Sequence, residues 1–227
     1  MPHTPSGLPK TMLPREKLLH LGAHTLSDTE LLALFLRTGV AGKNVFQLAD
    51  ELIQQFRGLA GLIQSSAQDL VGVKGLGGTA KRAQLIGILE MSRRVLTQQL
   101  QEQPIMNSPK IVKDFLQLQI GALAHEVFAV MFLDNQNRLL SFQPMFRGSL
   151  TQTMVYPREI AKVALALNAN GVVLSHNHPS GVLEPSQNDL DLTRSLRMTL
   201  SMIDVRIHDH IIVTRTGAFS MAEAGLV

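Results

Sequence analysis

Two histidines and an aspartate lie close together in the sequence, in a pattern that could bind a metal ion. His176 and His178 directly follow the apolar run 171–174, and Asp189 comes eleven residues after His178. If the run is a buried strand, side chains two residues apart share one face, so both imidazoles point in the same direction. Two imidazole nitrogens and one carboxylate oxygen, with a fourth position left to water, form the catalytic type of zinc site. The spacing therefore predicts one zinc ion per chain, bound by His176, His178 and Asp189.

The residues between His178 and Asp189 indicate how the aspartate could be aimed. Pro179 and Gly181 favour a turn, and Ser186 precedes an expected helix that has Asp189 in its first turn. A serine and an acid three residues apart are also typical of a capping box, which is a purely structural device. Both interpretations can hold together, because a cap that fixes the helix start also aims Asp189.

A second pair of histidines, His208 and His210, has the same spacing near the end of the chain. We expect both on one face of a last strand over residues 207–214. The one acid that follows is Glu223, in the tail, so the pattern does not favour a second zinc site. These histidines either orient a ligand of the first site or pack in the core.

The composition excludes several classes of protein. The chain has 227 residues, 45% of them hydrophobic, and no cysteine, which rules out disulfides, zinc fingers and thiol catalysis. With nine Phe, one Tyr and no Trp, base stacking on an aromatic platform is not favoured. The first residues lack the apolar segment of a signal peptide, and the longest apolar run, Val127–Leu133, is too short to span a bilayer. We therefore expect a soluble cytoplasmic protein without membrane association.

The sequence predicts two domains. Residues 1–100 read as short helices with no alternating strand, and Ser27-Asp28-Thr29-Glu30 predicts a capping box. Residues 101–109 are polar, rich in Gln and contain two prolines, so they are interpreted as a linker. Residues 110–227 alternate strands and helices, which predicts an α/β layered sheet flanked by helices.

The site residues and other segments together are similar to a known family. The run HNHPSGVLEPSQND resembles the metal motif of JAMM/MPN+ proteases, His-x-His-Pro followed by Ser-x-x-Asp. Asn177 lies between the histidines, where deubiquitinating members usually have Ser or Thr, and with the following Pro-Ser-Gly it resembles the bacterial RadC family. PREKLL, LSDTELLALFLRTG, VFAVMFLD, VYPREI and DHIIV are similar to that family too, from about Leu13 to Val227. The resemblance implies a JAMM/MPN-type mixed sheet after a small all-α, helix-hairpin-helix-like domain.

The resemblance also implies catalytic roles for two residues outside the metal set. The motif serine corresponds to Ser186, which would hydrogen-bond a developing oxyanion. The family's general base, a glutamate just before an apolar strand, corresponds to Glu126, which would move a proton from the zinc water to the leaving amine. Glu159 and Glu184 are alternatives, but Glu159 suits a helix N-terminus and Glu184 lies in the loop between the ligands.

The glycine segment 73–83 resembles a helix-hairpin-helix, whose turn can hold a DNA phosphate on its backbone N–H groups. Lys74, Lys81 and Arg82 would add charge, and residues 1–100 carry eleven Lys or Arg against seven Asp or Glu. The stretch GGTAKRAQL is one residue longer than the usual form, and the glycines could instead make a tight turn between two helices. A modest basic excess is equally typical of a solvated surface.

Three functions follow from these patterns. The first is a zinc metallopeptidase that hydrolyses a peptide or isopeptide bond in an unidentified peptide or protein substrate. The second, implied by the RadC resemblance, is a DNA-binding accessory protein in repair or recombination. The third is a metal-dependent nuclease, which the sequence favours less because it contains no second metal cluster.

Overall fold

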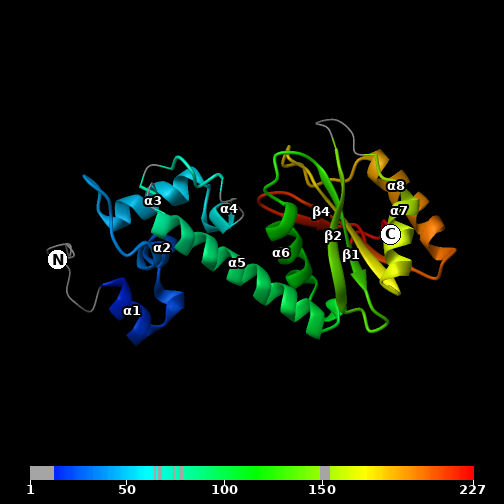
Figure 1. Ribbon diagram of the computed structural model, residues 1–227, viewed down its shortest axis with the longest axis horizontal. Helices are drawn as coiled ribbons and strands as arrows, with labels where there is room; N and C mark the ends of the chain where they lie inside the picture. The colour runs from blue at the N-terminus through cyan, green and yellow to red at the C-terminus, as the bar shows by residue number, and fades with distance from the viewer. Residues whose placement is uncertain (1–12, 64, 66–67, 74, 77–78, 149–153) are drawn as a thin grey trace. The chain divides into compact units, whose positions relative to one another are not determined.

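The computed structural model describes residues 13–63, 65, 68–73, 75–76, 79–148 and 154–227. The chain forms two compact units, Met1–Glu90 and Met91–Val227 (Figure 1). The boundary between them lies within the helix α5, Thr79–Glu102.

The first unit is helical, as predicted. Besides the start of α5 it contains α1 (Pro14–Leu21), η2 (Ala23–Thr25), α2 (Asp28–Leu36), α3 (Val45–Gln55) and α4 (Leu59–Ile63). In its described part, the strand-like pairing amounts to one isolated bridge between Val40 and Lys43. The predicted capping box of Ser27 and Glu30 is confirmed, and Asn44 and Gln47 form a second one at the start of α3. Buried leucines from several helices, among them Leu32, Leu48, Leu52, Leu76 and Leu85, form the core of this unit.

The glycine segment lies partly outside the described residues, since Lys74, Gly77 and Gly78 are not among them. Lys81 donates hydrogen bonds from Nζ to the carbonyl oxygens of Thr38 (2.5 Å) and Gly39 (2.9 Å), just after the end of α2. Burial lowers the pKa of Lys81. The ammonium group therefore already has partners inside the first unit, and phosphate binding by this segment stays a prediction.

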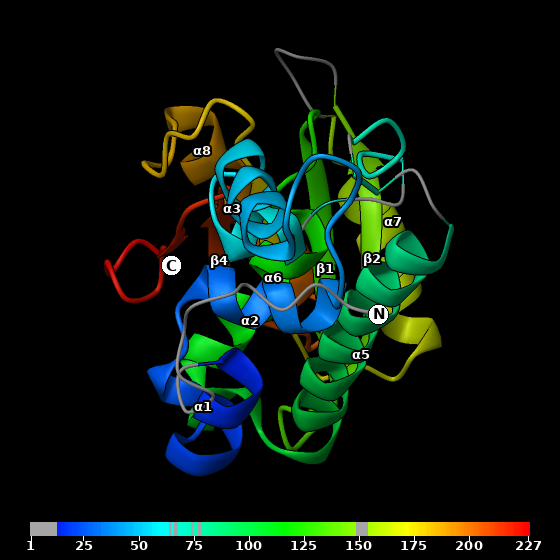
Figure 2. The ribbon, with the colours of Figure 1, turned by 90° about the vertical axis from the view of Figure 1, so that its left-hand side faces the viewer.

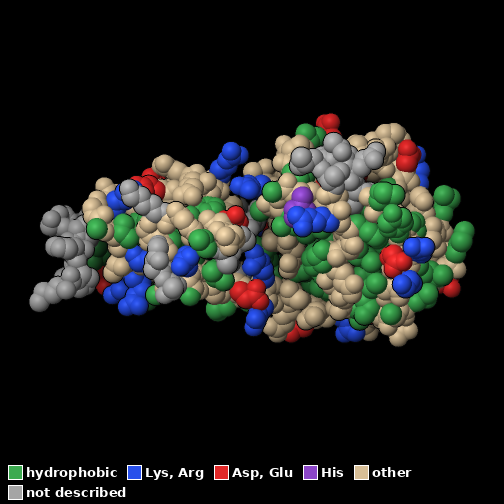
Figure 3. All heavy atoms as spheres, turned by 45° about the horizontal axis from the view of Figure 1, so that its top comes forward, with side chains coloured by type: hydrophobic (Ala, Val, Ile, Leu, Met, Phe, Trp, Pro, Cys, Tyr) green, Lys and Arg blue, Asp and Glu red, His purple; other side chains and the backbone are tan. Residues whose placement is uncertain are grey.

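The surface drawn in Figure 3 bears on the same question. On that face, the described Lys and Arg side chains are scattered among hydrophobic, acidic and other side chains. Within neither unit do they gather into one continuous basic stripe on the face seen there. A nucleic-acid surface would be expected to concentrate positive charge.

The predicted linker 101–109 is instead part of the second unit. It covers the end of α5, η3 (Ile105–Asn107) and the start of α6 (Pro109–Ile120). Leu100 and Ile105 are buried in the core beside the sheet, and the Ile105 N–H donates to the carbonyl of Asn137 (2.9 Å). Ile105 within the segment and Leu100 directly before it are enough to pack it beside the sheet, although its overall composition is typical of a linker.

The second unit is built around a five-stranded mixed sheet in the order β2-β1-β3-β4-β5. Its strands are β1 (Val127–Leu133), β2 (Leu139–Arg147), β3 (Gly171–Asn177), β4 (Arg206–Val213) and β5 (Ala218–Ser220). The pairing of β3 with β4 is parallel and the other pairings are antiparallel. This confirms the predicted α/β class.

Helices cover both faces of the sheet. α6 packs on one face, and α7 (Pro157–Ala166) and α8 (Gln187–Ser201) pack on the other (Figures 1 and 2). All seven residues of β1 and all seven of β3 are buried, which explains the continuous apolar sequence of β1 and the apolar run 171–174 in β3. Among the residues described in the two units, no helix has the length and hydropathy needed to cross a membrane.

A β-bulge in β4 decides where the second histidine pair points. Val172 of β3 pairs with Ile207 and Val173 pairs with Asp209, so His208 is an extra residue in the ladder. His208 then covers Gly171 on the α6 face, where a Cβ at Gly171 would collide with its ring. His210 lies on the opposite face, beside α8. The prediction that His208 and His210 share a face is wrong, because the bulge reverses the alternation between them.

The central strands should carry more of the stability than the edge strand. Leu174 of β3 is 0% exposed, whereas Leu140 of β2 is 40% exposed. We expect Leu174→Ala to lower the free energy of unfolding by about 2–5 kcal/mol, because it removes buried contacts and leaves a cavity. Leu140→Ala, the same change on the surface, should cost about 0.5 kcal/mol or less. Urea unfolding of the two variants measures the difference, and equal losses would contradict the assignment of the core.

Candidate metal centre

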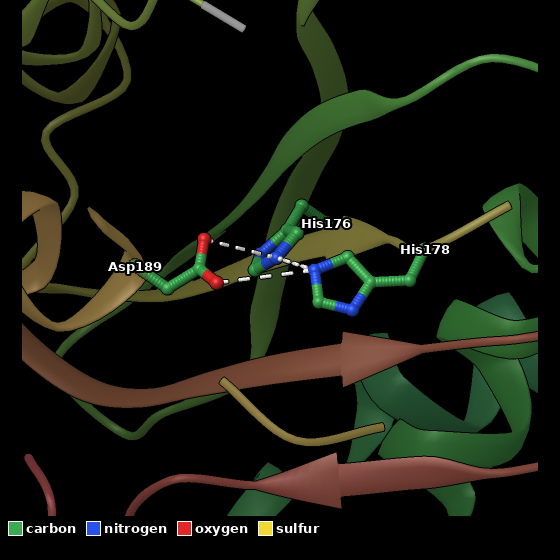
Figure 4. A group of neighbouring side chains, drawn as sticks. All are labelled: His176, His178 and Asp189. Carbon is green, nitrogen blue, oxygen red and sulfur yellow. Dashed lines mark hydrogen bonds and ion pairs between the residues drawn. The ribbon is translucent and has the colours of Figure 1, made fainter. Parts of the chain in front are cut away.

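The three predicted ligands converge at one point (Figure 4). His176 lies near the end of β3, His178 follows the strand, and Asp189 is in the first turn of α8. The Nε2 atoms of His176 and His178 are 2.9 Å apart, and Asp189 Oδ1 is 3.2 Å from His176 Nε2. Asp189 Oδ2 is 3.8 Å from His178 Nε2. Within the described ranges, this is the one group of three or more acidic, His or Cys side chains that could hold a metal ion.

The predicted capping box of Ser186 and Asp189 is also present. Asp189 Oδ2 accepts the Ser186 backbone N–H at 2.7 Å and the Ser186 hydroxyl at 2.6 Å, and the Asp189 N–H donates to Ser186 Oγ at 3.2 Å. Oδ1 remains directed at His176. The helix N-terminus also favours a carboxylate at this position. Both expected roles of Asp189 therefore coexist, with Oδ2 in the cap and Oδ1 directed at His176.

A chain of buried hydrogen bonds fixes the proton positions on His176. Thr193 Oγ1 donates to the backbone carbonyl of Asp189 (2.6 Å), so it must accept the bond from His210 Nδ1 (2.6 Å). His210 then carries its proton on Nδ1 and accepts at Nε2 from His176 Nδ1 (2.8 Å). His176 Nε2 is thereby left with a lone pair that faces His178 and Asp189.

The second ring is oriented in the same way. His178 Nδ1 donates to the carbonyl of Val182 (2.7 Å), which leaves a lone pair on its Nε2 as well. Two nitrogen lone pairs and a carboxylate oxygen therefore face one another with no donor between them. Such an arrangement is repulsive by itself and is satisfied by a cation, so the residues fit a metal ion.

Burial keeps the inner rings neutral. It lowers the pKa of His176 from 6.5 to about 4, an effect that His178 reinforces and that the Asp189 carboxylate opposes. Burial also holds the pKa of His210 well below its usual range. A neutral imidazole is the form that binds metals, so no proton has to be displaced from His176 near neutral pH.

Glu126 and Ser186 border the same cavity as the metal group. This cavity has a volume of about 330 Å³, and its lining includes Glu126, Phe128, Ser186 and the three candidate ligands. Glu126 immediately precedes β1, and Phe128, two residues later, pairs directly with His176 of β3. The sheet register therefore brings the predicted base to the metal group.

The two alternative bases are not in the lining of this cavity. Glu159 is in the first turn of α7, where Arg158 and Lys162 pair with its carboxylate and lower its pKa, Lys162 most strongly. Glu184 is exposed in the loop before α8. Ser186 borders the cavity, but its hydroxyl proton is given to Asp189. Its predicted role as an oxyanion donor therefore requires that proton to change partner and stays a prediction.

Sequence reasoning left the role of His210 open and missed Thr193 and the side chain of Asn177. Thr193 follows Asp189 by one helical turn, so its place on the same face of α8 could have been found from the sequence. The contact between His210 and His176 depends on the bulge in β4 and has no local sequence signal.

We expect the buried chain to tune metal binding. His210→Ala should weaken the binding of a divalent metal ion about 10- to 100-fold, because His176 loses the acceptor that fixes its proton and its ring. His208→Ala, two residues earlier in β4, is the matched control and should leave the affinity unchanged. Competition titration with a chromogenic chelator measures both, with circular dichroism to check folding. Equal effects of the two substitutions would refute the assignment of the chain.

Comparison with known proteins agrees with these observations. Residues 106–226 match the family described as "RadC-like JAB domain", and residues 6–83 match "UPF0758 N-terminal". A UPF0758 protein of Variovorax paradoxus (strain S110) is 57% identical over 220 residues, which cover 97% of this chain and 98% of that protein. A UPF0758 protein of Leptothrix cholodnii is 56% identical, with 97% and 99% covered. The chain therefore belongs to the UPF0758 family, and its second unit contains a RadC-like JAB domain.

Proposed function

We propose that this protein is a zinc-dependent metallopeptidase of the JAMM type, which hydrolyses a peptide or isopeptide bond. The observation that carries the proposal is the convergence of three acceptors, His176, His178 and Asp189, on a cavity that Glu126 also borders. Membership of the RadC-like JAB family supports the same conclusion.

The chemistry of the donors favours zinc. Two imidazoles and one carboxylate form a ligand set that catalytic zinc sites use, and the chain offers no cysteine for softer metals. When bound, zinc supplies Lewis acidity at the point where the three acceptors meet. His210 and Val182 fix the two imidazoles with their Nε2 lone pairs toward that point.

The remaining steps fall to the side chains that border the cavity. The Glu126 carboxylate would accept a proton from the attacking water and pass it to the leaving nitrogen. The Ser186 hydroxyl would turn from Asp189 to donate to the oxygen of the attacked carbonyl. The Ser186 backbone N–H, which donates to Asp189 Oδ2 at 2.7 Å, would keep the helix start in place during this change.

Phosphodiester chemistry is less well supported. Nucleases of the two-metal type need a second ion about 4 Å from the first, and the described residues contain a single candidate metal group. Among the described residues of the first unit, no specific observation favours DNA binding, since Lys81 already contacts two backbone carbonyls.

The metal content of the purified protein tests the first half of the proposal. We expect about one zinc ion per chain in the wild type and none after His178→Ala, because the variant loses one of three ligands. His24→Ala, a surface change in the first unit, is the control and should retain the metal. Plasma mass spectrometry gives the stoichiometry. A wild-type protein that takes up no zinc even when it is supplied would exclude the proposed cofactor.

The role of Glu126 tests the second half. Glu126→Gln should lower the rate of zinc-dependent hydrolysis about 10²- to 10⁴-fold with the metal retained, because the amide cannot accept a proton. Glu184→Gln and Glu159→Gln are matched controls and should keep full activity. The zinc-loaded proteins can be compared on peptide and isopeptide libraries by mass spectrometry. Undiminished activity of Glu126→Gln would remove this residue from the mechanism.

A further inference from the structure

The residue between the two histidine ligands points away from them. Asn177 follows His176 in β3, so its side chain lies on the opposite, α6 face of the sheet. It is 0% exposed. Burial of a polar side chain at this depth is costly unless the group is hydrogen-bonded.

The Asn177 amide satisfies this requirement entirely with backbone groups around Glu126. Its Oδ1 accepts the Val127 N–H at 2.7 Å. Its Nδ2 donates to the carbonyls of Leu123 at 3.2 Å and His125 at 3.1 Å. The three bonds therefore hold the peptide units on both sides of Glu126.

We propose that Asn177 is a positioning residue that holds Glu126 at a fixed place relative to the metal group. This inference rests on the proposed function, because only there does Glu126 act as the base beside the metal group. One strand end thereby serves two purposes: the imidazoles before and after Asn177 face the metal, and the amide between them anchors the segment that carries the base. A change in the position of β3 moves the ligands and Glu126 together.

Only asparagine suits this task among residues of similar size. The site needs one acceptor and two donated hydrogen bonds from the same short side chain, and a primary amide provides both. Aspartate keeps the acceptor but places a carboxylate oxygen opposite two carbonyl oxygens. Serine is too short to reach all three groups. Asn177→Ser therefore removes the anchor while a small polar side chain stays at this position.

A double-mutant cycle on zinc affinity tests the proposal without any substrate. In the wild-type background, Glu126→Gln should weaken zinc binding about tenfold, because Glu126 borders the same cavity as the three candidate ligands and its negative charge is lost. In the Asn177→Ser background, the same substitution should have a clearly smaller effect, because the segment loses the three hydrogen bonds from Asn177, although the Gly148 N–H still donates to the Glu126 carbonyl. Asn177→Asp, which keeps one of the three bonds, is a second background that should give an intermediate result and that serves if Asn177→Ser does not fold.

Ser175→Ala provides the matched control. Ser175 lies two residues before Asn177 on the same face of β3, is 0% exposed, and its hydroxyl has no hydrogen-bond partner in the described structure. In this background Glu126→Gln should keep its tenfold effect. Hydrogen exchange by mass spectrometry should show faster exchange at Val127 in Asn177→Ser and unchanged exchange in Ser175→Ala, because only the former removes the acceptor of that N–H.

The outcomes separate this inference from the proposed function. Equal effects of Glu126→Gln in all backgrounds, or no effect in the wild type, would overturn the positioning role. If hydrolysis is found, Asn177→Ser should lower kcat about 100-fold with KM nearly unchanged, because a displacement of about 1 Å is sufficient for such a loss. If exchange at Val127 becomes faster in Asn177→Ser but kcat is unchanged, the positioning role of Asn177 is wrong and the proposed peptidase function is unaffected. If the wild type shows no hydrolysis, the proposed peptidase function is wrong, and the double-mutant cycle on zinc affinity alone decides whether Asn177 positions Glu126.

Discussion

The antiparallel pairing of β1 with β3 is the constraint on which the candidate site depends. It sets Phe128 opposite His176, and so brings the residue before β1, Glu126, to the end of β3 that carries the histidines. Both strands are buried on two faces. A shift of one residue in their pairing would move every side chain of a strand to the opposite face of the sheet, so the register is fixed. Packing by α6 on one face and by α7 and α8 on the other therefore determines the position of the chemical groups.

The cost of this arrangement is that several polar side chains lie in the centre of a hydrophobic unit. His176, Asn177, Thr193 and His210 are all buried. Each has its partners: His210 joins His176 to Thr193, and Asn177 bonds only to backbone groups. The two networks lie on opposite faces of β3, so the strand is fixed from both sides. A half-satisfied network would have been worse than an apolar core.

The parts of the site that could be predicted are those encoded by local patterns. Side chains two residues apart in a strand share a face, which predicted that His176 and His178 lie together. The spacing from Ser186 to Asp189 predicted the helix cap. Glu126 depended on the family resemblance, because its closeness to His176 arises from pairing between distant strands. The place of His210 could not be read from spacing, since a single bulged residue, His208, changes which face it occupies. Leu100 and Ile105 show the same limit, because their burial requires a partner elsewhere in the chain.

The Asp189 carboxylate serves both the helix cap and the candidate metal group, and this has a consequence for the binding and release of the ion. Because Oδ2 is retained by Ser186 and both rings are held through their Nδ1 atoms, the ligands keep their positions without help from the ion. The ligand side chains therefore lose little conformational entropy when the ion binds. The start of α8 does not depend on the ion, because the Ser186–Asp189 cap already fixes it. Chelation should therefore yield a folded apoprotein that can be reloaded. This behaviour is the reverse of that of a zinc finger, whose fold is lost when its ion is removed.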